Sequence, residues 1–327
     1  MRDMAQSPDL LPPAILVAGP TASGKSALAL ALAERLGGVV INADSMQVYR
    51  ELRIVTARPD DADLARAPHA LYGVRPAAEA GTVAWWREAA LAEMQAAREA
   101  GRVPILCGGT GMYFAALTEG LAAIPPVPAP AREEARRLLA AEGPAALHAR
   151  LAALDPATAA RLRPSDSQRI ARAYEVVTGT GQGLGAWQAK GGTGPAPWRF
   201  AAIRLDPPRE ALRAAIAARW QAMLAEGAVE EVRALGALGL DPALPAMRAH
   251  GVPELLAHLA GRMTLEAASA RAVLVTGQYT KRQATWFRHH ALAMSGNEQV
   301  LLSRWGESAQ FLESLLEYCA AFVETSR

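Results

Sequence analysis

Lysine and cysteine are scarce in this chain of 327 residues, and long apolar runs are missing. The two cysteines, Cys107 and Cys319, each lie in an apolar pattern, which predicts buried free thiols and argues against a cysteine-based metal site. No apolar run approaches the roughly 18 residues of a membrane-spanning helix, so we expect no membrane partner. The polar start, Met1–Pro8, does not resemble a signal peptide, and the default expectation is a cytoplasmic protein.

The formal net charge is only +2, so no strong overall field attracts nucleic acid and any basic surface must be local. Apolar residues make up 51% of the chain, which allows a substantial core, and the length suits one large domain or two modest ones. Only three lysines occur, against 31 arginines. One of the three, Lys25, lies in the clearest motif of the sequence.

That motif is G-x-x-x-x-G-K-[ST], the phosphate-binding P-loop. It follows an apolar run that predicts a buried strand, Ala14–Ala18, and precedes a helical pattern over 26–36 that ends at Gly37-Gly38. Backbone N–H groups, a helix N-terminus and a lysine suit a diphosphate or a nucleotide such as ATP, and a serine hydroxyl suits Mg²⁺. We therefore predict a diphosphate- or nucleotide-binding loop, with Ser26 as the magnesium ligand, formed by Gly19, Pro20, Thr21, Ala22, Ser23, Gly24, Lys25 and Ser26.

Four apolar runs predict buried strands separated by helical patterns, which indicates an α/β fold with a P-loop NTPase-like parallel sheet. Ligands of such sheets lie beyond the carboxyl ends of the strands. The P-loop, Asp44 and the turn Gly108-Gly109-Thr110-Gly111 each follow a strand, and we expect them to converge on one crevice. A short helix, Met112–Leu117, should follow the last of these turns. The four predicted strands are Ala14–Ala18, Val39–Ala43, Val103–Cys107 and Phe200–Leu205.

The proline-rich stretch Ile124–Pro130 predicts a boundary, after which the pattern is helical and lacks strand candidates. We expect an all-helical insertion over 122–198 in an α/β core made of 13–121 and 199–295, with a flexible tail over 1–12. Within the insertion, helices are predicted over Arg132–Ala141, Pro144–Leu154, Pro156–Leu162 and Asp166–Val177, followed by a mobile Gly-rich stretch, Gly179–Gly194. Further along the chain we predict two long helices, Arg209–Leu235 and Leu265–Arg288, and a C-terminal strand and helix over 296–327 without visible chemistry.

Asp44 and Thr110 are the candidates for chemistry at the strand ends. A carboxylate beside a phosphate site can hold magnesium through water or act as a general base; alternatively, Asp44 caps a helix that begins near Ser45. Thr110 can offer its N–H and hydroxyl to phosphate, or merely cap the next helix. Position alone leaves these alternatives open.

Basic residues gather in two helical stretches. Four arginines lie in the insertion, and a late helix combines basic residues with Tyr279, Trp286 and Phe287. Basic residues interleaved with aromatic ones suit a phosphate backbone with unstacked bases. The alternative is a solvated helix face above a core aromatic stripe. The basic residues are Arg161, Arg163, Arg169 and Arg172 in the insertion, and Lys281, Arg282, Arg288, His289 and His290 in the late helix.

The motifs together resemble the tRNA dimethylallyltransferases, also called tRNA isopentenyltransferases. The resemblance spans roughly residues 13 to 290. It rests on the P-loop and, in family order, on Ile41–Arg50, Thr56–Pro59, Ala67–His69, Gly108–Tyr113, Asp166–Val176 and Lys281–Arg288.

The resemblance implies transfer of a dimethylallyl group from dimethylallyl diphosphate to the N6 amine of adenosine 37 in tRNA, next to the anticodon. It also implies release of diphosphate, a requirement for Mg²⁺, a monomer, and an insertion that grips the anticodon stem-loop. In the family pattern the residue matching Asp44 is the general base, and those matching Thr110, Arg219 and the P-loop handle the diphosphate. Contact with tRNA is expected from Asp44, Ser45, Met46, Gln47, Arg132, Gln168, Arg169, Ile170, Ala171, Arg172, Met247, Arg248, Ala249, His250, Gly251, Val252, Lys281 and Arg282.

Three positions depart from the family pattern. Val55 stands where a glycine usually precedes Thr-Ala-[KR]-Pro, and Gly277 stands in place of a basic residue. Ala249-His250-Gly251-Val252 replaces an Ile/Val-Gly-Tyr segment, which shifts the glycine and removes the tyrosine. These departures concern local tRNA contacts more than the chemistry.

Three other functions compete with this one. A small-molecule kinase would use the same P-loop for ATP, with the arginine-rich insertion as its lid. An adenylate isopentenyltransferase would alkylate free AMP and should lack an RNA-gripping insertion. A non-enzymatic RNA-binding P-loop protein would not need Asp44 and Thr110 at the strand ends.

Overall fold

The computed structural model describes residues 11–306 and 312–325. The described residues divide into two compact units. The first consists of the residues up to Thr118 and from Ala196 onward, and the second consists of Glu119–Pro195. We call them the core unit and the helical unit. The predicted insertion covered 122–198.

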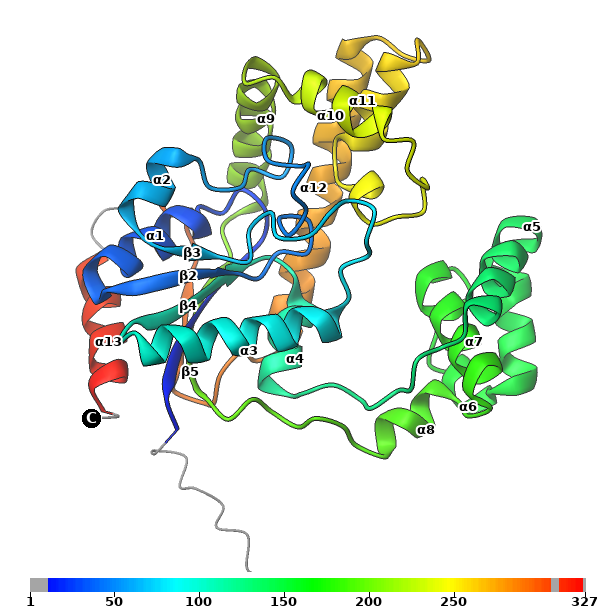
Figure 1. Ribbon diagram of the computed structural model, residues 1–327, viewed down its shortest axis with the longest axis horizontal. Helices are drawn as coiled ribbons and strands as arrows, with labels where there is room; N and C mark the ends of the chain where they lie inside the picture. The colour runs from blue at the N-terminus through cyan, green and yellow to red at the C-terminus, as the bar shows by residue number, and fades with distance from the viewer. Residues whose placement is uncertain (1–10, 307–311, 326–327) are drawn as a thin grey trace, which may run out of the picture. The chain divides into compact units, whose positions relative to one another are not determined.

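The core unit is built on a six-stranded parallel sheet in the order β3-β2-β4-β1-β5-β6 (Figure 1). At its centre β1 pairs with β4 and β5, so that Ile15 lies between Ile105 and Ala201. The predicted parallel α/β fold is confirmed, and all four predicted strands are present. The strands are β1 Pro13–Ala18, β2 Gly38–Asn42, β3 His69–Ala70, β4 Val103–Gly108, β5 Arg199–Leu205 and β6 Glu298–Leu301.

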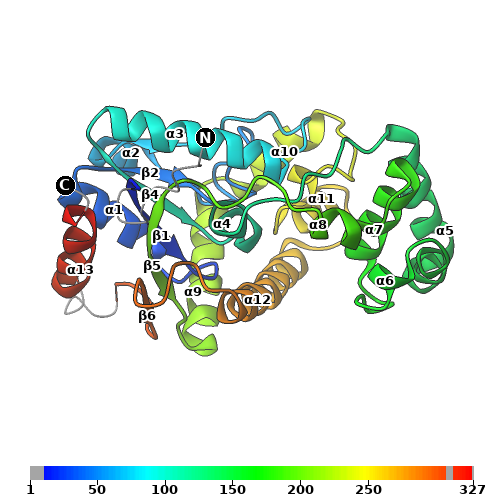
Figure 2. The same ribbon diagram turned by 90° about the horizontal axis from the view of Figure 1, so that it is seen from below.

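The two faces of the sheet bury alternate residues of each strand. Ile15 and Val17 pack with α1 (Lys25–Leu36) and α13 (Leu312–Glu324), which lie side by side in Figures 1 and 2. Leu16 and its even-numbered neighbours face the other core, which includes Trp86 of α3. The remaining core helices are α2 Asp61–Arg66, α3 Val83–Glu99, α4 Gly111–Thr118, α9 Arg209–Ala225, α10 Ala228–Ala237, α11 Val252–Leu259 and α12 Leu265–His289, with a 3₁₀ turn, η2, at Ala246–Arg248.

Two predicted segments differ from the structure. The single helix expected over Arg209–Leu235 is wrong, because Gly227 adopts φ 100° and separates α9 from α10. A left-handed residue cannot continue a right-handed helix, and glycine takes this conformation without steric cost. The stretch expected to be Gly-rich and mobile, Gly179–Gly194, contains the end of helix α7 (Ser167–Thr180) and a further helix, α8 (Leu184–Ala189).

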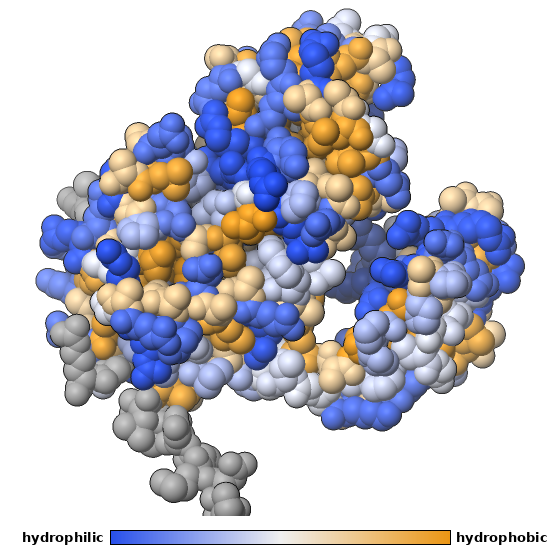
Figure 3. Space-filling view, viewed as in Figure 1, coloured by the Kyte–Doolittle hydropathy of each residue, from blue (hydrophilic) through white to orange (hydrophobic). Residues whose placement is uncertain are grey.

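The helical unit contains α5 (Ala129–Leu154), α6 (Pro156–Ala159), α7 (Ser167–Thr180) and α8. Gly143 interrupts α5 with φ 80° and ψ 174°, where two separate helices were predicted. Asp166 caps α7 by accepting a hydrogen bond from the Arg169 amide at 3.4 Å, as the sequence signal indicates. Hydrophilic residues cover much of the visible face of this unit, on the right of Figure 3.

Among the described residues, no helix combines the length and apolarity that crossing a membrane requires. Cys107 and Cys319 are both buried free thiols, as predicted. Burial raises the pKa of Cys107 to about 11 and that of Cys319 to about 12, so both are protonated at neutral pH.

Candidate active site

The P-loop links β1 to α1 through a tight, partly left-handed turn. Ala22 has φ 66° and Gly24 has φ 89°, and the Ser23 amide donates to the Pro20 carbonyl at 3.2 Å. Helix α1 begins at Lys25 without a side-chain cap, so its first N–H groups face the loop. This is the geometry that binds anions at a helix N-terminus.

Lys25 is held in an environment that opposes its own charge. Its side chain is 9% exposed, and Nζ donates only a long hydrogen bond, 3.4 Å, to the Pro20 carbonyl. Burial lowers the pKa of Lys25, the nearby Arg219 lowers it further, and Asp44 and Cys107 partly restore it. A diphosphate bound here would supply the counter-charge that burial removes.

A cavity of about 350 Å³ opens beside the loop. It brings together the ammonium of Lys25, the exposed Ser26 and Arg219 from α9. The Arg219 guanidinium donates to the Thr56 carbonyl at 3.3 Å; burial lowers its pKa, and Asp44 acts in the opposite direction. Four cationic side chains therefore line the cavity, since Arg66 and Arg304 join Lys25 and Arg219, and Asp63 is the one carboxylate in the lining. The other lining residues are Ala22, Gly24, Ala27, Leu30, Val40, Ala57, Pro59, His69, Tyr72 and Ala215.

Asp44 and Thr110 meet at the ends of β2 and β4. The Thr110 hydroxyl accepts the Ser45 amide at 2.9 Å and lies 3.2 Å from the Ser45 hydroxyl, and the Thr110 amide donates to the Ala43 carbonyl at 3.2 Å. Asp44 Oδ1 accepts the Met46 amide at 3.0 Å. No helix begins near Ser45, so the helix-cap interpretation of Asp44 is wrong. The Thr110 side chain binds the Asp44 turn instead of capping α4.

Buried Asn42 fixes the direction of the Asp44 turn. Its amide accepts the Asp44 N–H at 2.8 Å and donates to the carbonyls of Asp44 and Leu71, both at 3.0 Å. The backbone of Asp44 is therefore held by a side chain that is itself fully buried. The carboxylate is placed within electrostatic reach of both Lys25 and Arg219.

Gln283 of α12 joins two walls of this site, a role that the sequence did not indicate. Its Oε1 accepts the Thr21 amide of the P-loop, and its Nε2 donates to the Gly109 carbonyl, both at 2.9 Å. The side chain is 5% exposed. A Cβ at Gly109 would lie 2.2 Å from Gln283 Nε2, so only glycine admits this approach. The overlooked signal is a polar residue on the buried stripe that also contains Thr280 and Phe287.

Gln283→Leu should therefore destabilise the fold and loosen the P-loop. One buried and one partly buried backbone group would lose their partners, at a cost of up to about 1–3 kcal/mol each. Diphosphate should bind at least about tenfold more weakly. Urea unfolding and calorimetric titration with diphosphate measure both effects. Gln95→Leu is the control: Gln95 is an exposed residue of α3, and its replacement should change neither. Wild-type diphosphate affinity in Gln283→Leu would show that the bridge does not shape the loop.

Residues 53–55 are fixed by Glu231, which lies in the first turn of α10. One carboxylate oxygen accepts the amides of Arg53 and Ile54 at 2.7 Å, and the other accepts that of Val55 at 2.9 Å. The valine side chain is only 7% exposed and packs in the core, and its φ is not positive. A glycine is therefore not required at this position for backbone reasons.

Glu231→Ala should lower the free energy of unfolding by about 2 kcal/mol or more, because three backbone donors lose a charged acceptor. Thermal and urea unfolding test this expectation. Glu230→Ala is the matched control, since Glu230 occupies the same helical turn but is exposed. Equal losses in the two variants would mean that the helix dipole, and not the carboxylate clamp, accounts for the effect.

Of the six expected tRNA contacts at Met247–Val252, two present side chains at the surface. Arg248 is exposed and His250 is half-buried, while the other four are buried. His250 lies with its ring centroid 4.7 Å from that of Tyr279, and Arg282 lies 5.4 Å above the same tyrosine. Burial and Arg282 lower the pKa of His250, whereas Glu254 and Asp44 raise it.

Other expected tRNA-binding residues lie at different depths. Lys281 and Arg282 are exposed on α12, and Ser45, Met46 and Gln47 are half-buried. The Gln47 amide is engaged with the Thr56 and Ala57 carbonyls at 2.9 and 2.8 Å. Within the helical unit, Arg132, Gln168, Arg169 and Arg172 are exposed and Ala171 is half-buried, but Ile170 is fully buried in the core of that unit, so its side chain is not available to RNA.

The C-terminal segment, expected to carry no chemistry, supports the P-loop. Arg304 Nε donates to the Ala22 carbonyl at 2.9 Å, and the Trp305 amide donates to the Ser23 carbonyl at 3.0 Å. A Cβ on Gly24 would lie 2.6 Å from the Trp305 carbonyl oxygen. The second glycine of the motif is thus required by its φ and by this contact.

Mg²⁺ prefers oxygen ligands and usually binds through one or two protein groups together with phosphate and water. The exposed hydroxyl of Ser26, at the cavity, and the carboxylate of Asp44 are oxygen donors of the right kind. The residues present therefore fit a magnesium ion bound mainly through a diphosphate.

Fold and site together define a P-loop α/β protein with a cavity beside the loop, lined by Lys25 and Arg219, and with the Asp44 carboxylate within electrostatic reach of both cations. The family model described as IPP transferase matches residues 47–290. The tRNA dimethylallyltransferase of Acidiphilium cryptum is 59% identical over 99% of this chain and all of that protein, and that of Granulibacter bethesdensis is 63% identical over 84% of this chain and 86% of that protein.

The crystal structure of the full-length tRNA isopentenylpyrophosphate transferase from Bacillus halodurans superposes with a TM-score of 0.68 at 30% identity, covering 96% of this chain and 97% of that one. A eukaryotic dimethylallyltransferase crystallised while acting on tRNA shares the fold, with a TM-score of 0.79 at 23% identity over 97% of this chain and 80% of that one. This chain belongs to the tRNA dimethylallyltransferase family, and it is therefore a tRNA-modifying prenyltransferase. The resemblance found in the sequence motifs is confirmed.

Proposed function

We propose that the enzyme transfers the dimethylallyl group of dimethylallyl diphosphate to N6 of adenosine 37, the nucleotide 3′ to the anticodon of tRNA, and releases diphosphate. The observation that carries this proposal is the link between the two halves of the site. Thr110, at the end of β4, hydrogen-bonds the turn that contains Asp44, while Lys25 and Arg219 face the adjoining cavity. Asp44 acts electrostatically on both Lys25 and Arg219, which supports a diphosphate leaving group and a proton acceptor serving the same reacting carbon.

The part of the site that would hold the leaving group suits a reaction in which a carbon–oxygen bond breaks. As the C–O bond of the donor breaks, negative charge grows on the departing diphosphate. Lys25, Arg219 and the N–H groups at the start of α1 are positioned to stabilise that charge, and their stabilisation is strongest where water is excluded. Mg²⁺, when bound, would neutralise part of the diphosphate charge.

The part of the site around Asp44 suits an aromatic amine as the nucleophile. The lone pair of such an amine is delocalised and therefore weakly reactive. The amine nitrogen forms the new N–C bond, and Asp44 accepts the proton that the nitrogen loses. Such proton transfer typically contributes about 10²- to 10⁴-fold. The Met46 amide binds Oδ1 at 3.0 Å, so Oδ2 is the oxygen that we assign to the amine.

The target adenosine must leave its stack to reach Asp44, at a cost of about a few kcal/mol. Exposed Arg169 and Arg172 on α7 and exposed Lys281 and Arg282 on α12 supply cations for the RNA backbone. The aromatic pair of His250 and Tyr279 adds a surface suited to unstacked bases. Asp44 influences the pKa of both residues, so the pair lies near the carboxylate.

The proposal is tested by incubating the enzyme with labelled dimethylallyl diphosphate, Mg²⁺ and unmodified tRNA, with ATP and AMP as alternative acceptors. We expect label in tRNA that depends on Mg²⁺ and on adenosine at position 37. Label in AMP or ATP would instead favour an adenylate isopentenyltransferase. Phosphate transfer from ATP, without movement of the label, would favour a kinase.

A further inference from the structure

Tyr113 holds a buried hydroxyl that no described protein group satisfies. The residue lies in the first turn of α4, directly after the Gly108–Gly111 turn, and it is 3% exposed. Its ring is stacked on Trp86 with 4.1 Å between centroids and 10° between planes. Trp86 is fixed in turn by a 2.8 Å hydrogen bond from Nε1 to the Asn42 carbonyl. The phenol oxygen itself has no hydrogen-bond partner among residues 11–306 and 312–325.

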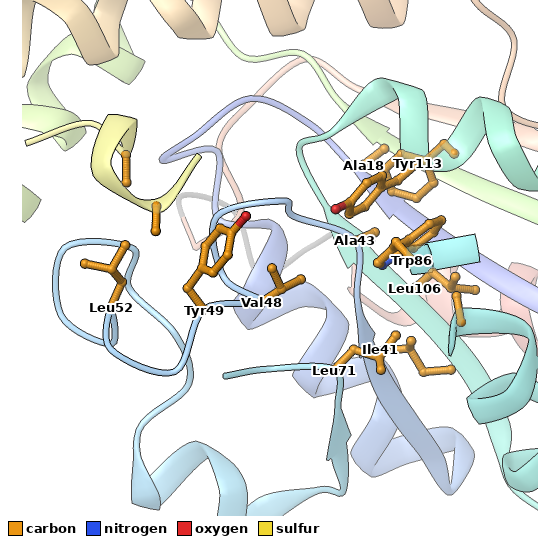
Figure 4. Close-up of a cluster of buried hydrophobic side chains, with 14 of the residues drawn as sticks. Ala18, Ile41, Ala43, Val48, Tyr49, Leu52, Leu71, Trp86, Leu106 and Tyr113 are labelled. Atoms are coloured by element: carbon orange, nitrogen blue, oxygen red, sulfur yellow. The ribbon is translucent and has the colours of Figure 1, made fainter. Parts of the chain in front are cut away.

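This hydroxyl is a neutral donor within electrostatic reach of Asp44. Burial raises the pKa of Tyr113, and the negative charge of Asp44 raises it further, so the phenol keeps its proton. Figure 4 shows the Tyr113 oxygen at the end of its ring that is turned toward Tyr49. The Tyr49 oxygen is engaged, since it accepts the Gly81 amide at 3.0 Å. Of these two phenols, Tyr113 is the one whose oxygen has no hydrogen-bond partner among the described residues.

Packing alone does not explain the hydroxyl. Phenylalanine would pack equally well against Trp86 and the surrounding apolar core. A buried hydroxyl without a hydrogen-bond partner lowers the stability of the fold. A buried polar group without a protein partner needs an explanation, and a partner supplied by the substrate is one. Because protein atoms cover the oxygen, a ligand reaches it only by parting the side chains above it.

We propose that Tyr113 donates a hydrogen bond to a ring nitrogen of the target adenine, next to the amine that Asp44 deprotonates. This inference rests on the proposed function. Adenine presents an N–H donor at N6 beside an acceptor nitrogen, N1 on one side and N7 on the other. An acceptor from Asp44 and a donor from Tyr113 match that pair. Guanine presents O6 in place of the amine, which would face the Asp44 carboxylate. Tyr113 would therefore help to select adenine.

The variant Tyr113→Phe removes only the hydroxyl. We expect kcat/KM for tRNA to fall about tenfold, as for one lost substrate hydrogen bond, while Tm rises by about 1–3 °C. Tyr318→Phe is the matched control: Tyr318 also has a buried hydroxyl without a partner among the described residues, but it lies on α13. The control should gain stability and keep wild-type kcat/KM.

Stem-loop RNAs that carry 1-deazaadenosine or 7-deazaadenosine at position 37 identify the acceptor. We expect one analogue to lower the rate of the wild-type enzyme about tenfold and to cause no further loss in Tyr113→Phe, because both changes break the same hydrogen bond. Multiplicative losses for both analogues, or wild-type kcat/KM in Tyr113→Phe, would overturn the inference. No transfer by the wild-type enzyme to unmodified RNA would contradict the proposed function itself.

Discussion

Replacing Asp44 with asparagine (Asp44→Asn) should lower kcat by about 10²- to 10⁴-fold and leave the KM values for both substrates within about threefold. Asparagine keeps an oxygen that can accept the Met46 amide, so the turn should persist. It cannot take up the proton that the amine loses. The loss is therefore expected in the chemical step and not in binding, and single-turnover transfer to saturating tRNA measures it.

Asp61→Asn is the control for charge removal. Asp61 is exposed in the first turn of α2 and does not line the cavity. This control should keep wild-type kcat. Near wild-type transfer by Asp44→Asn at saturating tRNA would remove Asp44 from the role of base. A rise in KM with unchanged kcat would instead make it a binding residue.

Lys25→Ala should reduce kcat/KM by about 10²- to 10³-fold, as expected when a donor to developing negative charge is removed. It should also weaken binding of inorganic diphosphate. Stability should not fall in parallel, because burial lowers the pKa of Lys25 and the fold therefore opposes its charge in the absence of an anion. We expect an unchanged or higher Tm together with the loss of activity.

Arg35→Ala tests whether any cation on α1 has the same effect. Arg35 lies in the last turn of the same helix, is exposed, and approaches Glu313 only at 3.8 Å. This variant should retain wild-type kcat/KM. Full diphosphate affinity in Lys25→Ala would contradict the placement of the leaving group at the P-loop.

The sequence was sufficient where function depends on local patterns. The P-loop motif predicts the strand–loop–helix geometry that the structure confirms, because its residues are contiguous. The roles that the motif assigns to Lys25 and Ser26 stay predictions. Asp44 and Thr110 could be paired because parallel strands bring their carboxyl ends to one edge of a sheet. The family motifs supplied Arg219, which lies on α9 and would not be found from its local pattern.

What the sequence did not show depends on contacts between distant segments. Gln283 binds Thr21 across 262 residues, and Arg304 binds Ala22 across 282. The buried stripe of α12 shows that Gln283 is a polar residue in a buried position, but no pattern in the sequence identifies its hydrogen-bond partners. The break at Gly227 was missed for a different reason: an isolated glycine inside a helical pattern is often tolerated, and its left-handed conformation is known only once the flanking helices pack.

The most direct test of the account is the chemical identity of the product. tRNA transcripts that differ only at position 37 would be treated with the enzyme, donor and Mg²⁺, digested to nucleosides and analysed by mass spectrometry, with released diphosphate measured in parallel. The account predicts one dimethylallyl group on N6 of adenosine 37 for each diphosphate released, and no product from a transcript with guanosine there. Alkylation at another atom or nucleotide, or diphosphate release without alkylated tRNA, would contradict it.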